Sequence, residues 1–218
     1  RHTQWQLGES VNFELPKLPD KIVVVADCGC KESIDKVVEL CSNHGIMPLV
    51  YDKCGFCILV PNGVFCRPLR NVGRDLGTFL WFVSRYYNLI PDSTIMYFTA
   101  GNMKKHNRAD RLDSFFNGRT VSAGRLGDQE NFKLDKYDGV ILRQADQPNF
   151  RLWYEKYVGS WDPEKPGVCF NALIRTTGKQ IRMRPRTTYI NVYNELSLAD
   201  GLESVHFVER CIHALFIS

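Results

Sequence analysis

The chain has 218 residues, of which 44% are hydrophobic and 24% charged, and its formal net charge is +4 at pH 7. These values are ordinary for a soluble globular protein, and the chain is long enough to form one large domain with a substantial core. The modest positive charge suits a small anionic ligand such as a nucleotide. Because lysine and arginine form no dense strip in the sequence, we expect no nucleic-acid binding.

No hydrophobic run reaches the roughly 18 residues that a membrane span requires, and residues 1–20 lack the pattern of a signal peptide. We therefore expect a cytoplasmic protein without a transmembrane segment. The chain begins with Arg1 rather than methionine, so we expect a piece of a longer protein that has other domains.

Eight cysteines include the close pairs Cys28 and Cys30, and Cys54 and Cys57. Reduced thiols are the expected state in a cytosolic protein. A structural zinc site and disulfides stay open as alternatives, although Cys-x-Cys is an unusual first pair for zinc.

Residues 1–20 end in a proline-containing segment and predict an irregular lead-in to a single α/β domain over residues 21–218. The β-branched run Lys21–Ala26 is typical of a strand buried on both faces, and Ile46–Tyr51 predicts a second strand. An amphipathic helix that ends at His44 lies between them. The order β-α-β implies a parallel strand pair with a right-handed crossover.

Charged side chains follow both of these strands directly. Asp27 comes after the first strand, and Asp52 and Lys53 come after the second. Open α/β sheets bind ligands at the carboxyl ends of their strands, so we expect these side chains to face a ligand. Beyond them, residues 55–66 predict a strand-turn-strand unit with its turn at Pro61-Asn62-Gly63.

The segment Asn71–Leu80 joins a helix-start signal to a group of charged residues. Asn71 is a favourable N-cap, which would let backbone amides near Gly73 approach an anion, with Arg74 beside them as a cation. Hydrophobic residues then recur at helical spacing until the helix ends near Asn88. The segment predicts either a phosphate-binding helix start or an ordinary capped core helix.

A buried strand at Thr94–Phe98 is followed by a basic loop. Several cations close together could bind a diphosphate. The cations of this loop are Lys104, Lys105, His106 and Arg108. A solvated charged loop is the alternative.

The second half of the chain shows weaker patterns. The expected elements are a short helix over 111–117, a loop over 118–133 that could fold over a ligand, and strands over 138–143 and 168–174. The basic positions from Lys179 to Arg186 predict the solvated face of a short helix that ends at Pro185.

Two further helices carry candidate ligand-binding groups. In the aromatic helix over 149–157, Trp153 and Tyr154 could stack on sugar rings or belong to the core. In the last helix, over 204–216, His206 and Arg210 lie beside the hydrophobic stripe. Two histidines seven residues apart, without a third ligand, are a weak metal signal.

Two of these segments carry a family resemblance: Asn71-Val72-Gly73-Arg74-Asp75 and His206-Phe207-Val208-Glu209-Arg210. The chain resembles, over nearly its whole length, an uncharacterised domain-of-unknown-function family with an N-V-G-R-E helix start and an H-x-x-E-R helix. The Asn-x-Gly-Arg-Asp segment is also similar to the rhamnan-synthesis F family of polysaccharide glycosyltransferases. Together these resemblances imply one domain of the glycosyltransferase A type, with a mostly parallel central sheet flanked by helices.

The resemblance implies a glycosyltransferase that moves a sugar, such as the deoxyhexose rhamnose, from a nucleotide-sugar donor to a glycan acceptor. The alternative is a non-catalytic nucleotide- or carbohydrate-binding module of a larger protein. No Asp-x-Asp metal motif follows the strand that ends at Phe98, so we expect neither a divalent metal nor another cofactor, with protein cations replacing the metal.

In this interpretation each candidate residue has a role. Asp75 or His206 is the catalytic base, and Trp153, Tyr154 and Arg210 bind the acceptor. The donor-binding residues are Asp27, Asp52, Lys53, Asn71, Gly73, Arg74, Lys104, Lys105, His106 and Arg108.

Overall fold

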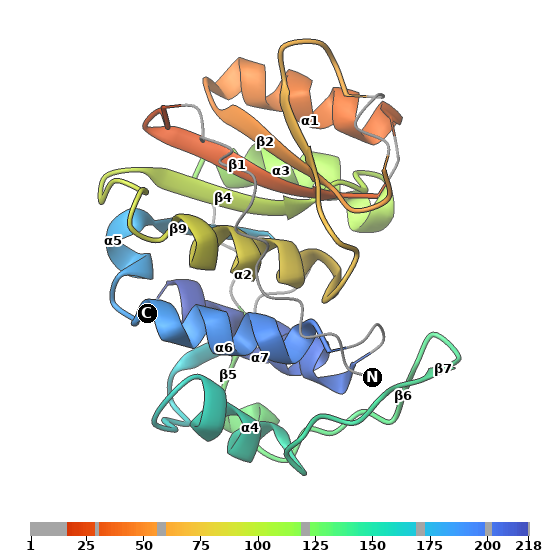
Figure 1. Ribbon diagram of the computed structural model, residues 1–218, viewed down its shortest axis with the longest axis vertical. Helices are drawn as coiled ribbons and strands as arrows, with labels where there is room; N and C mark the ends of the chain where they lie inside the picture. Colours follow the sequence, from red (N-terminus) through yellow and green to blue (C-terminus); the bar gives the residue numbers. More distant parts are fainter. Residues whose placement is uncertain are drawn as a thin grey trace, which may run out of the picture.

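The structure is a computed structural model that describes residues 17–28, 31–55, 60–118, 123–168, 173–198 and 202–217. Its centre is a five-stranded sheet with the strand order β3-β2-β1-β4-β9 (Figure 1). Strands β3, β2, β1 and β4 are parallel, and β9 is antiparallel to β4. The expected mixed α/β fold with a mostly parallel central sheet is confirmed.

The predicted β-α-β unit is present at the start of the domain. Strand β1 (Lys21–Asp27) and strand β2 (Met47–Asp52) are parallel, and helix α1 (Lys31–His44) connects them. Ile22 pairs with Met47 and Asp27 with Asp52, so both strands end at one edge of the sheet. That register brings the charged residues after the two strands together.

Helices cover both faces of the sheet. Helices α1 and α3 (Arg108–Phe116) lie on one face, while α2 (Arg74–Tyr86), α6 (Arg186–Leu196) and α7 (Glu203–Phe216) lie on the other (Figure 1). Alternate residues of β1 belong to two hydrophobic cores, one on each face of the sheet. Val23 and Val25 pack with α1 and α3, and Ile22 and Val24 pack with α2 and α7. Both faces of β1 are buried, as its continuous β-branched run predicts.

The remaining elements extend this framework. They are β3 (Phe65–Pro68), β4 (Ile95–Ala100), η2 (Lys105–Asn107), β5 (Ala123–Arg125), η3 (Gly127–Gln129), β6 (Lys136–Tyr137), β7 (Val140–Ile141), α4 (Phe150–Tyr157), β8 (Pro166–Val168), β9 (Ile174–Thr177) and α5 (Gly178–Ile181). None of the helices in the described ranges is both long and apolar enough to cross a bilayer.

Several expected elements differ from the structure. The strand before Pro61 falls partly on residues 56–59, outside the described residues, and β3 pairs in parallel with β2. The expected loop over 118–133 contains β5 and η3, and β5 pairs with β8. The expected strand over 138–143 is only the short β7, which pairs with β6 in a two-stranded hairpin. Helix α6 was not predicted.

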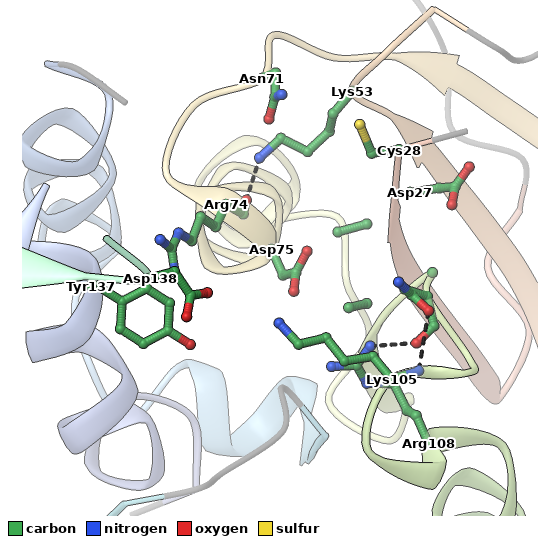
Figure 2. A pocket seen from close by; sticks show the side chains of 14 residues that line it. Asp27, Cys28, Lys53, Asn71, Arg74, Asp75, Lys105, Arg108, Tyr137 and Asp138 are labelled. Atoms are coloured by element: carbon green, nitrogen blue, oxygen red, sulfur yellow. Dashed lines mark hydrogen bonds between the residues drawn. The ribbon is translucent and has the colours of Figure 1, made fainter. Parts of the chain in front are cut away.

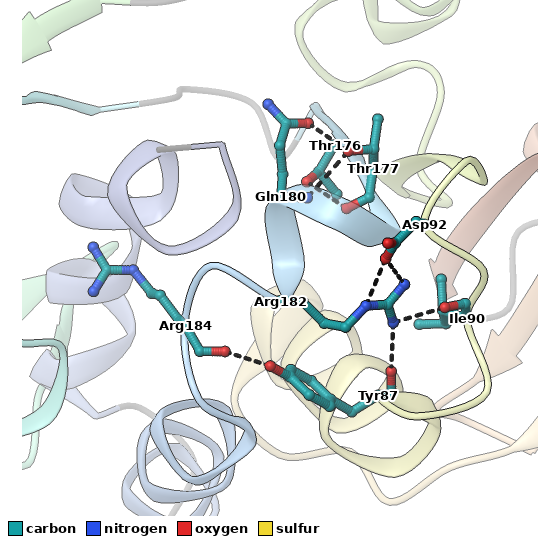
Figure 3. Close-up of polar contacts among 8 residues, drawn as sticks. All are labelled: Tyr87, Ile90, Asp92, Thr176, Thr177, Gln180, Arg182 and Arg184. Atoms are coloured by element: carbon teal, nitrogen blue, oxygen red, sulfur yellow. Dashed lines mark hydrogen bonds and ion pairs between the residues drawn. The ribbon is translucent and has the colours of Figure 1, made fainter.

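The predicted solvated basic face is wrong for Arg182 and Arg184, which are partly buried, whereas Arg186 is exposed as predicted. The guanidinium of Arg182 donates to the carbonyl oxygens of Tyr87 (3.0 Å) and Ile90 (2.7 Å), just beyond the end of α2, and also pairs with Asp92 (Figure 3). Carbonyls near a helix C-terminus lack helical partners and carry partial negative charge, so a cation stabilises them.

Arg184 and Arg186 act in the same way. Arg184 donates to the carbonyl of Ala214 in the last turn of α7 and to the carbonyl of Val158 at the end of α4. Arg186 donates to the carbonyl of Ser84 near the end of α2. The basic segment therefore joins the C-terminal ends of three helices; Lys179 and Arg186 are exposed, whereas Arg182 and Arg184 are partly buried.

We expect Arg182→Ala to lower the free energy of unfolding by roughly 2–3 kcal/mol, because it removes charge-assisted hydrogen bonds from partly buried carbonyls. Lys179→Ala, in the same segment but at an exposed position, is the matched control and should change stability little. Urea denaturation of both variants measures the difference. Equal stabilities would contradict the structural role of Arg182.

Candidate functional site

A cavity of about 380 Å³ opens at the carboxyl ends of β1 and β4. From β1 the chain adds β2 and β3 on one side of β1, and then β4 on its other side. The strand order therefore reverses between β1 and β4. In open α/β sheets this reversal point is where ligands bind. The cavity is lined by Ala26, Asp27, Cys28, Lys53, Asn71, Arg74, Asp75, Ala100, Gly101, Asn102, Lys105, Arg108, Tyr137 and Asp138 (Figure 2).

Asp27 and Gly101 meet where β1 and β4 end. The backbone amide of Gly101 donates to the carbonyl of Ala26 over 2.7 Å, and Asp27 is only 5% exposed. A Cβ atom on Gly101 would lie 2.3 Å from Oδ1 of Asp27 and 3.0 Å from its Cα. A side chain at position 101 would therefore clash with Asp27, so glycine is required for this close approach.

The start of α2 has an unusual backbone. The predicted N-cap at Asn71 is wrong: the helix begins at Arg74, the capping position is Gly73, and no side chain caps it. Gly73 (φ 63°) and Arg74 (φ 49°) both adopt left-handed conformations. A positive φ is uncommon for a residue such as Arg74 and is often found at functional sites. Asn71 instead lines the cavity.

Lys53 holds this backbone in place. Its ammonium group donates to the carbonyl oxygen of Val72 over 2.8 Å and to that of Arg74, and the side chain is buried. Gly77 packs closely against the same loop, because a Cβ atom at position 77 would lie 2.3 Å from the Val72 carbonyl oxygen. Lys53 thus fixes the loop that carries Arg74, in addition to lining the cavity.

The carboxylate of Asp75 lies near several cationic side chains of the cavity. Burial raises the pKa of Asp75, whereas the positive charges of Arg108, Lys53 and Lys105 act in the opposite direction. Arg108 is 4% exposed and donates to the carbonyl of Asn102 over 2.6 Å, and burial lowers its pKa. A carboxylate with a raised pKa that faces a cavity is a candidate proton acceptor.

The far wall of the cavity comes from the β6–β7 hairpin, a segment that sequence reasoning did not assign to the site. Tyr137 and Asp138 line the cavity. The guanidinium carbon of Arg74 lies 4.8 Å from the centre of the Tyr137 ring, a cation–π contact, and the His206 ring lies 4.7 Å from it. The Asp138-Gly139 turn was the available sequence signal, because this dipeptide favours a tight hairpin.

Three other expected donor-binding residues, Asp52, Gly73 and Lys104, lie outside the cavity lining. Asp52 is 1% exposed, and its Oδ1 accepts hydrogen bonds from the amides of Cys54 and Gly55 in an Asx-type turn. Gly73 is buried against Leu196. Lys104 forms an exposed ion pair with Glu32 over 2.5 Å. The side chain of His106 lies outside the described part of the structure.

The structure also corrects the expected acceptor-binding residues. Trp153 and Tyr154 are 0% exposed and belong to the core between α4 and α7, so neither ring can stack on a sugar in this structure. Arg210 covers the ring of Phe132 and donates to the carbonyl of His206 over 2.8 Å. These side chains stabilise the domain beside the site.

His206, the second candidate base, does not line the cavity. It is 3% exposed, and its Nδ1 lies 3.0 Å from Oε2 of Glu209. Its Nε2 is buried, with no hydrogen-bond partner among the described residues. Because its ring contacts Tyr137 on the cavity wall, His206 supports that wall from behind.

A disulfide joins Cys28 to Cys54, so the expected reduced state of these two cysteines is wrong. Cys28 follows β1 and lines the cavity, and Cys54 follows β2. Cys66 is also disulfide-bonded, whereas Cys41 and Cys211 are buried free thiols. Cys30 and Cys57 lie outside the described residues. The described residues contain no group of three or more potential metal ligands.

We expect the double variant Cys28→Ser/Cys54→Ser to lose roughly 2–4 kcal/mol of folding free energy, because the cross-link constrains the unfolded chain. The bond also ties together the segments after β1 and β2 at the cavity edge. Denaturation with and without a reducing agent measures the effect. Wild type and double variant should converge under reducing conditions, and equal oxidised stabilities would contradict the prediction.

The fold and the cavity together define an α/β protein with a cavity lined by charged residues at the strand-reversal point of its sheet. No family model matches the sequence, and no curated protein shows significant similarity to it.

Proposed function

We propose that the protein is a glycosyltransferase that binds a nucleotide-sugar donor in this cavity and transfers the sugar to a glycan acceptor. The observation that carries the proposal is that Arg74, Lys105 and Arg108 line one cavity together with the partly buried carboxylate of Asp75. A diphosphate needs several cationic donors, and an acceptor hydroxyl needs a base. The cavity offers both within one space at the expected edge of the sheet.

The proposed reaction uses the charged groups as follows. Asp75 removes the proton of an acceptor hydroxyl, whose oxygen forms a bond to the anomeric carbon of the donor sugar. The bond from that carbon to the diphosphate oxygen breaks, and the diphosphate leaves with the electron pair. Lys105 and Arg108 stabilise the negative charge that develops on the leaving diphosphate.

The finer assignment to the glycosyltransferase A type rests on the family resemblance and is supported by the parallel strands whose carboxyl ends carry the cavity. We propose that the cavity cations replace a divalent metal. The donor sugar proposed from the local resemblance is a deoxyhexose such as rhamnose.

The test is a thermal-shift panel of nucleotide sugars, followed by an assay of donor hydrolysis with and without EDTA. We expect at least one nucleotide sugar to raise the melting temperature and to be turned over in EDTA. A requirement for a divalent ion that persists in chelation controls would contradict the metal-independent mechanism. A panel with no binding would contradict the proposed function.

The alternative is a binding module without catalysis. Arg74 is exposed and lies over the Tyr137 ring, a position that suits ligand binding. A binding module needs such a cation but no catalytic base. Binding of a nucleotide sugar without turnover, whatever the acceptor, would favour this alternative.

A further inference from the structure

Hydrogen bonds attach the base of the β6–β7 hairpin to helix α7. The carboxylate of Glu203, which is 1% exposed at the start of α7, accepts the amide of Leu134 over 2.8 Å and the amide of Ala145 over 3.1 Å. These two amides lie on opposite arms of the hairpin. The amide of Leu142 also donates to the carbonyl of Asp135 across the arms.

The turn of the hairpin fixes the two residues that reach the cavity. Tyr137 pairs with Val140, so Asp138 and Gly139 form a two-residue turn, and both have positive φ values of 48° and 80°. Such a turn matches the right-handed twist of its strands. Asp138 therefore has a defined position next to Tyr137.

The ring of Tyr137 is already occupied by protein groups. Arg74 and His206 both contact it, and Tyr137 is partly buried. The hydroxyl of Tyr137 and the carboxylate of Asp138 point toward the side of the cavity where Asp75 lies (Figure 2). The hairpin consequently presents two hydrogen-bonding groups to the cavity, across from the ends of β1 and β4.

We propose that this hairpin forms the acceptor subsite, in which the Asp138 carboxylate and the Tyr137 hydroxyl bind the hydroxyl groups of a neutral saccharide. The inference rests on the proposed transferase function and adds the residues that select its second substrate. Sugar hydroxyls donate well to carboxylates, so the Asp138 carboxylate suits an acceptor that offers hydroxyl groups. His206 and Glu203 position the subsite without touching the saccharide.

Two conservative substitutions test the subsite without disturbing the fold. Tyr137→Phe removes the hydroxyl and keeps the ring between its protein neighbours. Asp138→Asn removes the charge, and asparagine tolerates the left-handed conformation of the turn. Lys136→Ser, at an exposed position of the same hairpin outside the cavity lining, is the matched control.

The measurements separate the two sides of the cavity. Titration calorimetry with UDP, GDP, CDP and dTDP gives the affinity for the diphosphate side. Saturation-transfer NMR with neutral mono- and disaccharides, in the presence of the diphosphate that binds most tightly, gives the affinity for the acceptor side. We expect saccharide affinity to fall roughly 10- to 100-fold in Asp138→Asn and about 2- to 10-fold in Tyr137→Phe. Diphosphate affinity should be unchanged in Tyr137→Phe and Lys136→Ser, and equal or higher in Asp138→Asn, which removes a negative charge from the cavity.

The possible failures are distinguishable. A wild-type protein that binds no nucleoside diphosphate and hydrolyses no nucleotide sugar would overturn the proposed function, and the acceptor subsite with it. A protein that binds a diphosphate but none of the saccharides would overturn the subsite alone. The subsite is also overturned if saccharide affinity is unchanged in Asp138→Asn, or if diphosphate affinity falls together with it.

Discussion

Asp75→Asn is expected to lower kcat for sugar transfer roughly 100- to 10,000-fold, the range over which a positioned base contributes to catalysis. The amide keeps the size of the side chain but cannot accept the proton of an acceptor hydroxyl. Asparagine also removes a negative charge from beside Arg108 and Lys105, so nucleoside diphosphate affinity should stay equal or rise. Steady-state transfer kinetics and calorimetry measure the two effects.

The pH profile provides a second check on the same residue. Burial raises the pKa of Asp75, and the base must be ionised, so wild-type transfer should rise with pH through that raised pKa. The residual activity of Asp75→Asn should lack this acidic limb. Asp110→Asn, at an exposed position of helix α3, is the control and should keep this pH dependence. An acidic limb that persists in Asp75→Asn would assign the base to another group.

Asp75 also has a defined effect on stability. A carboxyl whose pKa is raised in the folded state binds more protons there than in the unfolded state, so its contribution falls as pH rises through the interval between the two values. The Asp75→Asn variant has no titratable carboxyl at this position, so it does not undergo this pH-dependent loss of stability. The stability of the variant relative to wild type should therefore increase as pH rises from about 4, the ordinary aspartate range, toward neutrality.

The central sheet was predictable because its strands carry strong local signals. The β-branched run of β1 is buried on both faces, and the glycine after His44 ends α1 as expected. Parallel strands end at one edge, so the positions of Asp27 and Lys53 at the cavity followed from their place in the sequence. Periodicity and strand order were sufficient for this half of the site.

The other half of the site depends on contacts between distant segments. The strands β6 and β7 contain two residues each, too few to show an alternating pattern. Their position against Arg74 and His206 is set by Glu203 and by ring contacts that no local pattern encodes. For the same reason, the sequence did not reveal that Trp153 is fully buried.

The charge pattern over residues 179–186 was misleading, in contrast to that at the strand ends. The three arginines at 182, 184 and 186 resemble a solvated face, and their role at helix ends depends on the tertiary position of those ends. Helix α6 begins at the last of them and has hydrophobic and polar residues mixed around its axis, so its helical periodicity is weak.

Arg74→Ala is expected to weaken nucleoside diphosphate binding roughly 10- to 100-fold, because it removes a charge-assisted contact at the edge of the cavity. Arg74 is exposed, so the substitution costs little core packing. Alanine also removes the contact with the Tyr137 ring. Calorimetry with the diphosphate that binds wild type most tightly measures the loss, and circular dichroism shows whether the fold is intact.

Arg74→Lys separates the two possible roles of this side chain. Lysine keeps the positive charge but lacks the planar guanidinium that stacks on Tyr137 and forms bidentate contacts with phosphate. If charge alone matters, diphosphate affinity should return close to wild type; if the stacked geometry matters, affinity stays low and saccharide binding at the hairpin falls with it. Unchanged diphosphate affinity in Arg74→Ala would remove this residue from the donor site. The left-handed backbone at Arg74, held by Lys53, would then position the hairpin rather than the donor.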